Sequence, residues 1–165
     1  MSAAVHIATQ VIANAFDPYG SGDVVGGVYR LRGAAGPRGG RLKQAVVFDT
    51  YGDGYPVRLF LFDRPPVQAN DNLPPDDNEA FNPSAASCAR CVFSVPVASN
   101  DYVAVGTRKA AFVAIDRVAA DDWDAEADQG SQGPGDLWLV VTSGSAQTWN
   151  SNNSLVVRLG FEWVG

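Results

Sequence analysis

The spacing of apolar residues constrains the fold of this chain most. In short segments they alternate with polar residues, and almost nowhere do they recur every third or fourth position as in a helix. Clusters of Gly, Pro, Asn and Asp, which favour turns, bound these segments. Valine outnumbers leucine by 21 to 9, and β-branched side chains favour strands. The sequence therefore predicts an all-β fold.

We predict eight or nine strands, and two local signals within them. The double glycine Gly26-Gly27 predicts a bulge, and Thr50 to Gly54, which contains an Asp-Gly pair, predicts a hairpin turn into the next strand. The candidate strands are Val5 to Val11, Val24 to Arg32, Leu42 to Phe48, Val57 to Phe62, Cys91 to Val97, Tyr102 to Val105, Ala110 to Ile115, Leu137 to Thr142 and Leu155 to Val164.

Two polar stretches are too long for ordinary connections, Arg64 to Ser87 and Ala119 to Asp136. We expect both to be loops outside the core, the first with one helical turn over Asp76 to Phe81 anchored by Phe81. The nearly continuous apolar run Leu137 to Val141 predicts a strand covered on both faces, as in a two-sheet sandwich or an oligomer. Without a repeat or a dividing linker, residues 1–165 are expected to form one β-sandwich domain.

The charge balance argues against two classes of partner. Eighteen acidic residues against twelve basic ones give a net charge of -6, which disfavours nucleic acid and acidic membrane surfaces. No apolar run is long enough to span a bilayer, and the N-terminus lacks the features of a signal peptide. We therefore expect neither nucleic acid nor membrane as a direct partner, and a chain that begins at Met1.

The residues needed for catalysis are scarce. His6 is the only histidine, and no GxSxG motif marks a nucleophile. Cys88 and Cys91 form a lone CxxC that leads into a strand, which favours ordinary thiols or a structural cross-link over a redox or zinc site. The glycines around Gly20 to Gly27 do not form a dinucleotide-binding loop, because Val25 occupies a required glycine position. We expect neither enzymatic activity nor a cofactor.

Acidic residues gather in the two loops. Nine of the eighteen form two groups within these loops: Asp71, Asp76, Asp77 and Glu79 in the first, and Asp121, Asp122, Asp124, Glu126 and Asp128 in the second. The second group does not form an EF-hand, because Ala127 replaces the required glycine. We expect solvated acidic loops without a metal.

Basic residues form the opposite pole of the chain. No acidic residue interrupts the run from Arg30 to Lys43, whose five basic members are Arg30, Arg32, Arg38, Arg41 and Lys43. Such separation of charge suits docking onto an acidic surface or between copies, and it suits a solubilising face equally well. We predict that these five residues contribute to partner binding.

The tryptophans raise one candidate function, a carbohydrate-binding sandwich. Trp138 and Trp163 lie inside predicted strands, which favours the core or an interface. Trp149, in a polar segment, is the best candidate for an exposed sugar-stacking platform, and Trp123 is a second one. A ring folded back on the sheet is the commoner arrangement for such a loop aromatic.

Four segments resemble a family of small virion proteins of tailed bacteriophages, the capsid-associated or head decoration proteins. They are Tyr19 to Gly26, Val46 to Asp49 with Val57 to Pro66, Asp77 to Phe81, and Leu137 to Val141 with Ser154 to Phe161. The resemblance spans nearly the whole chain, although the acidic segment around Trp123 and the Cys88/Cys91 pair depart from the family.

The resemblance implies a β-sandwich of the jelly-roll type without enzymatic activity. It further implies a capsid decoration, or cement, protein on the outer surface of the virion head, where a homo-oligomer would bind and stabilise the assembled lattice of the major capsid protein. The alternative function in the same setting is a carbohydrate-binding β-sandwich module of a virion fibre or spike.

Overall fold

The computed structural model describes residues 4–15, 17–119 and 135–163. These contain nine strands, one short α-helix and one 3-10 helix, labelled η1. The elements are β1 (Ala4–Ile12), β2 (Val24–Leu31), β3 (Gly40–Asp49), β4 (Val57–Phe62), α1 (Ala85–Cys88), β5 (Cys91–Val97), η1 (Ser99–Asp101), β6 (Tyr102–Val105), β7 (Arg108–Ala119), β8 (Leu137–Ser143) and β9 (Leu155–Trp163). Every predicted strand is confirmed, and β7 extends furthest beyond its predicted ends.

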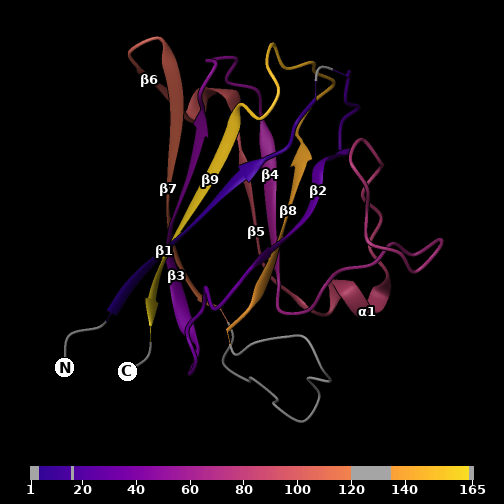
Figure 1. Cartoon of the computed structure of the whole chain (residues 1–165), viewed down its shortest axis with the longest axis vertical. Coiled ribbons are helices and arrows are strands. Elements are labelled where there is room, and N and C mark those ends of the chain that lie inside the picture. Colours follow the sequence, from indigo (N-terminus) through magenta and orange to yellow (C-terminus); the bar gives the residue numbers. More distant parts are fainter. Residues whose placement is uncertain (1–3, 16, 120–134, 164–165) are drawn as a thin grey trace.

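The strands form two antiparallel sheets packed as a sandwich (Figure 1). One sheet has the order β1-β9-β3-β7-β6, and the other has the order β2-β8-β4-β5. Along the chain, successive strands from β1 to β4 alternate between the sheets, as do β7, β8 and β9. With β6 as an added edge strand, this is the strand order of an eight-stranded jelly roll. The predicted all-β sandwich is confirmed.

The predicted hairpin at Thr50 to Gly54 is wrong, because β3 and β4 belong to different sheets. The segment is instead an arch that carries the chain across the sandwich. The buried carboxylate of Asp49 accepts hydrogen bonds from the backbone N–H groups of Tyr51 (3.0 Å), Gly52 (2.9 Å) and Gly54 (2.7 Å). Gly52 and Gly54 adopt positive φ, so the glycines mark a tight turn as predicted, although this turn connects two sheets and not two paired strands.

The main core lies between the two sheets, where the inner-facing residues of both interlock. Strand β8 is buried at all seven positions, and this confirms the prediction that Leu137 to Val141 is covered on both faces. Its inner side chains, such as Leu139 and Val141, belong to the main core. Its outer side chains, Trp138 and Val140, belong to a second apolar cluster on the far side of the four-stranded sheet.

That second cluster is covered by the long connection between β4 and β5. Phe81 of this connection packs its ring against those of Phe60 (5.1 Å between centroids) and Phe62 (6.1 Å) on β4. We call the apolar outer surface formed by Phe60, Phe62, Trp138 and Val140 the covered face. Phe81 is therefore an anchor, as the sequence predicted.

Backbone hydrogen bonds hold the covering segment to β2. Val24 N–H donates to the carbonyl of Glu79 (2.7 Å), and Asn78 N–H donates to that of Val24 (2.8 Å). The N–H of Phe81, which would close the last turn of a helix over Asp76 to Phe81, instead donates to the carbonyl of Gly22 (3.1 Å), so the predicted helical turn is wrong and a tight turn stands in its place. The predicted bulge at Gly26-Gly27 is confirmed by the register shift between Val24 and Val28.

Candidate functional site

The predicted basic run does not form one surface. Arg30 lies on β2 in the four-stranded sheet, whereas Arg41 and Lys43 lie on β3 in the five-stranded sheet. Arg32 and Arg38 are exposed in the connection between these strands, and neither makes an ion pair with any residue that the structure describes. The five residues that are close in sequence therefore divide into three different environments.

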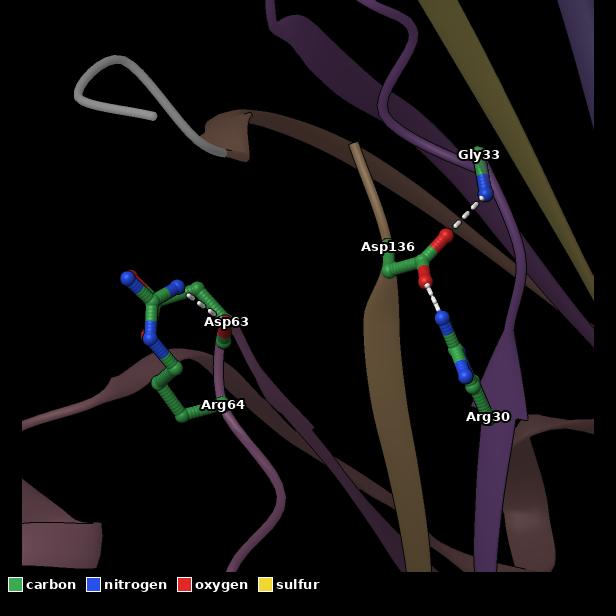
Figure 2. A network of polar contacts seen from close by, with 5 residues as sticks. All are labelled: Arg30, Gly33, Asp63, Arg64 and Asp136. Carbon is green, nitrogen blue, oxygen red and sulfur yellow. Dashed lines mark hydrogen bonds and ion pairs between the residues drawn. The ribbon is translucent and has the colours of Figure 1, made fainter. Parts of the chain in front are cut away.

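Arg30 belongs to a partly buried network around Asp136 (Figure 2). Its Nε donates to Oδ2 of Asp136 at 2.7 Å, and the backbone N–H of Gly33 donates to Oδ1, also at 2.7 Å. The Arg30 guanidinium also lies 5.8 Å from the centre of the Trp138 ring. Since Asp136 is only 3% exposed, this ion pair joins β2 to the start of β8 and has a structural role.

A second polar contact in the same view lies at the end of β4. Nη1 of Arg64 donates to the backbone carbonyl of Asp63 at 2.9 Å (Figure 2). The Asp63 carboxylate pairs with Arg90, just before β5, at 2.9 Å. The Asp63 N–H also donates to the Arg90 carbonyl (3.1 Å), so the contacts between Asp63 and Arg90 bring the two ends of the long connection together.

Arg41 and Lys43 form exposed ion pairs across the five-stranded sheet. Both donate to Oδ1 of Asp116 on β7, at 3.0 and 3.1 Å, and Lys43 also lies 3.8 Å from Glu162 on β9. The hydrogen bonds from Arg41 and Lys43 hold the pKa of Asp116 below its usual value. These side chains thus form a mixed-charge rim rather than a basic patch.

The outer surface of the five-stranded sheet carries the largest group of exposed apolar side chains in the described residues. They are Val5, Ile7 and Val11 on β1, Val103 on β6 and Phe112 on β7, and the half-buried ring of Phe48 on β3 lies beside that of Phe112. We call this surface the open face. Val5 is 76% exposed and Phe112 is 55% exposed, although both lie within regular strands. Exposed apolar surface of this kind marks interaction sites in soluble proteins.

A hollow of about 210 Å³ lies at the centre of the open face. Its floor is Gly160 of β9, which is in register with Ile7 on one side and Gln44 on the other. Ile7, Phe48, Phe112 and Arg158 stand around it. Because glycine has no side chain, the sheet is recessed there, and an apolar group of a partner can enter between the neighbouring side chains.

Trp149, the best candidate for an exposed sugar-stacking platform, is completely buried, which is the commoner arrangement for a loop aromatic and removes this candidate. Its ring packs edge-on against Tyr19 (5.3 Å) and Tyr55 (5.7 Å) in the main core. Trp138 is also buried, and Trp163 is partly buried against the core, as expected for strand residues. Trp123 lies outside the described residues.

The cysteines are both free thiols, Cys88 at the end of α1 and Cys91 at the start of β5. Burial raises the pKa of the Cys91 thiol, which disfavours the reactive thiolate. Of the two alternatives that the sequence left open, ordinary thiols and a structural cross-link, the structure shows ordinary thiols.

The first acidic loop is attached more firmly than a solvated loop would be. Oδ1 of Asp77 accepts hydrogen bonds from the Tyr19 hydroxyl (2.9 Å) and from the backbone N–H of Gly26 (2.6 Å). Among the described residues, no three His, Cys, Asp or Glu side chains are placed to share a metal ion. The acidic residues of the second loop, Asp121 to Asp128, lie outside the described residues.

The open face is the feature that sequence reasoning missed. The alternation of Val5, Ile7 and Val11 placed them on one side of a strand, but alternation does not tell which side meets solvent. The absence of charge could have indicated that the outer side of this strand is apolar, because residues 4 to 12 contain no Lys, Arg, Asp or Glu.

Comparisons with protein-family models, with curated proteins and with solved structures found no match for this chain. None of the helices in the described residues has the length and apolar character needed to cross a bilayer.

Proposed function

We propose that this chain is a structural virion protein, a capsid decoration protein that binds and stabilises the assembled head of a tailed bacteriophage. Its partner is the lattice of the major capsid protein, its place is the outer surface of the virion head, and it acts as a homo-oligomer. The class of partner comes from the sequence resemblance. The proposal gives the chain no catalytic step.

One observation carries the proposal: the open face is apolar, while the other apolar outer face is covered by the chain's own loop. An apolar centre around Gly160 with charged side chains at its rim has the anatomy of a protein–protein interface. A rigid sheet also binds at low entropic cost, because its backbone is already ordered. The open face is therefore the surface that we assign to the capsid lattice.

Decoration works by mass action. A protein that binds the assembled lattice and not the dispersed subunits stabilises the lattice by its binding free energy. Arg32 and Arg38, exposed beside the sandwich, keep their predicted role in docking, whereas Arg30 is assigned to the fold.

The test is cosedimentation of the purified chain with assembled heads and, separately, with dissociated capsid subunits. We expect binding to heads only, and about 5- to 30-fold weaker binding for Phe112→Ser, since losing one apolar anchor costs about 1–2 kcal/mol. Leu73→Ser is the matched control, because Leu73 is 60% exposed but lies in the loop of the covered face. Equal binding by both variants, or equal binding to subunits and heads, contradicts the proposal.

A further inference from the structure

The four edge strands of the sandwich differ in how they are protected. Edge strands expose unpaired backbone groups and invite pairing with another chain, unless a charge, a proline, a bulge, shortness or a covering segment prevents it. Strand β5 has Pro96, and β6 is only four residues long. Strand β2 is bulged at Gly26-Gly27 and is bridged by the covering segment at Asp23 and Ala80.

Strand β1 has none of these protections. It is nine residues long, contains no charged residue, proline or glycine, and pairs with β9 without any register shift. No other described strand pairs with it. Its outward side chains Val5, Ile7 and Val11 are all about half exposed or more. This edge is therefore suited to accept a further strand.

The sequence of β1 is nearly symmetric in residue character about Ala8. An antiparallel copy of β1 centred there pairs Val5 with Val11 and Ile7 with Thr9 on the outer side, and His6 with Gln10 on the inner side. Each apolar outer residue thus meets an apolar or β-branched one, and such cross-strand pairs stabilise sheets. No position along the strand brings a charge against a charge.

The neighbouring strand β9 is compatible with the same arrangement. Its charged residues Glu162 and Arg158 are in register with Val5 and Thr9. In the symmetric pairing, Glu162 and Val5 of one copy lie in line, across the strands, with Val11 and Val156 of the second copy. In the same way, Arg158 and Thr9 lie in line with Ile7 and Gly160 of the second copy. Like charges are therefore kept apart, whereas a strongly charged strand from another protein finds no complementary charge on β1.

We propose that β1 is a dimerisation edge, at which two copies of this chain pair their β1 strands antiparallel about a two-fold axis at Ala8. The two five-stranded sheets then become one sheet of ten strands, and the two open faces become one continuous surface. Because β9 occupies the other edge of β1, each copy can pair with only one further β1 strand, and the assembly contains two copies. The inference deepens one part of the proposed function, the homo-oligomer, and rests on that part alone.

The test is the solution mass of the chain alone, measured by sedimentation at concentrations up to about 100 μM, where a dimer with a Kd near 1 μM is largely formed. We expect twice the 17.4 kDa of one chain. The double variant Ile7→Lys/Thr9→Lys places lysine opposite lysine at two places and is expected to raise the dimer Kd about tenfold or more.

The matched variant is Ile7→Lys/Thr9→Glu, which changes the same two outward positions but places lysine opposite glutamate in the proposed register. We expect it to restore the dimer. A monomeric wild-type chain, a dimer that survives in the Lys/Lys variant, or equal loss of the dimer in both variants overturns the proposal. Since these measurements contain no capsid, a monomer that still binds heads would refute this inference together with the homo-oligomer, and would leave the proposed binding to the capsid lattice intact.

Discussion

Both sheets carry apolar side chains on their outer surfaces, yet the chain covers only one of them. The covered face receives Phe81 from the connection between β4 and β5, which is held in place by Asp77 and by backbone bonds to β2. The open face receives nothing from the described residues and keeps Val5 and Phe112 in solvent. The difference separates apolar surface that stabilises the fold from apolar surface that is available for a partner.

The largest expected contrast comes from shortening one phenylalanine on each face. Phe62→Ala on the covered face removes a side chain that is 1% exposed and should lower the free energy of unfolding by about 3–5 kcal/mol. Phe112→Ala on the open face should change it by about 0.5 kcal/mol or less. Urea unfolding followed by tryptophan fluorescence measures both values. Similar losses would mean that Phe112 is buried in solution, and the comparison would fail.

The next contrast concerns one ion pair from each sheet, Arg30–Asp136 and Arg41–Asp116. Arg30→Ala leaves the buried carboxylate of Asp136 without its ion-pair partner, and we expect a loss of about 2–3 kcal/mol in unfolding free energy, less than for a fully buried pair because Arg30 is partly exposed. Arg41→Ala breaks a solvent-exposed pair with Asp116 and should cost far less. The same urea experiment compares them. Equal losses would show that Arg30 and Arg41 stabilise the fold to the same extent, and the difference between their environments would have no energetic consequence.

A smaller effect on stability is expected when the connection between β4 and β5 is held less firmly on the covered face. Asp77→Ala removes the acceptor of the Tyr19 hydroxyl and the Gly26 N–H, and should lower the free energy of unfolding by about 1–2 kcal/mol. Hydrogen exchange at the Gly26 amide should become faster. Asp77→Asn keeps an accepting oxygen and should retain most of the protection. Unchanged exchange in Asp77→Ala would show that Phe81 alone holds the segment.

The smallest effect is a dependence on pH at the rim of the open face. Folding lowers the pKa of Asp116, so its contribution to stability is present above the ordinary value of 3.8 and is lost as pH falls further, through the folded value. Asp116→Asn should therefore flatten the decline of Tm with pH below about 3.8, and leave Tm above that pH slightly reduced. An unaltered pH profile would show that the exposed pairs with Arg41 and Lys43 contribute nothing measurable.

Strands were predictable because their signal is local. Alternation and turn residues lie within each segment, and the ends of β4, β5 and β6 coincide with the prediction. The connections were less predictable, because Asp49 and its glycine turn serve an arch between sheets as well as they would serve a hairpin. Which strands become neighbours depends on packing between segments far apart in the chain.

The candidate site depended on the same distant packing. The polar segment around Trp149 left both an exposed and a folded-back ring open, and the choice depended on Tyr19 and Tyr55, from two other parts of the chain, which pack against the ring. Closeness in sequence made Arg30 and Lys43 look like one basic surface, although the chain crosses from one sheet to the other between them. The open face required knowledge of which side of β1 the second sheet would cover.

The pairing of β1 with β9 also has a consequence for the making of the protein. Ala4 is in register with Trp163, so the first strand finds its sheet neighbour only when the last one has left the ribosome. At ordinary speeds of translation this delay is on the order of ten seconds. During that interval β1 lacks its strand partner on both edges, so the β1 strand of another nascent copy can compete with β9 for it.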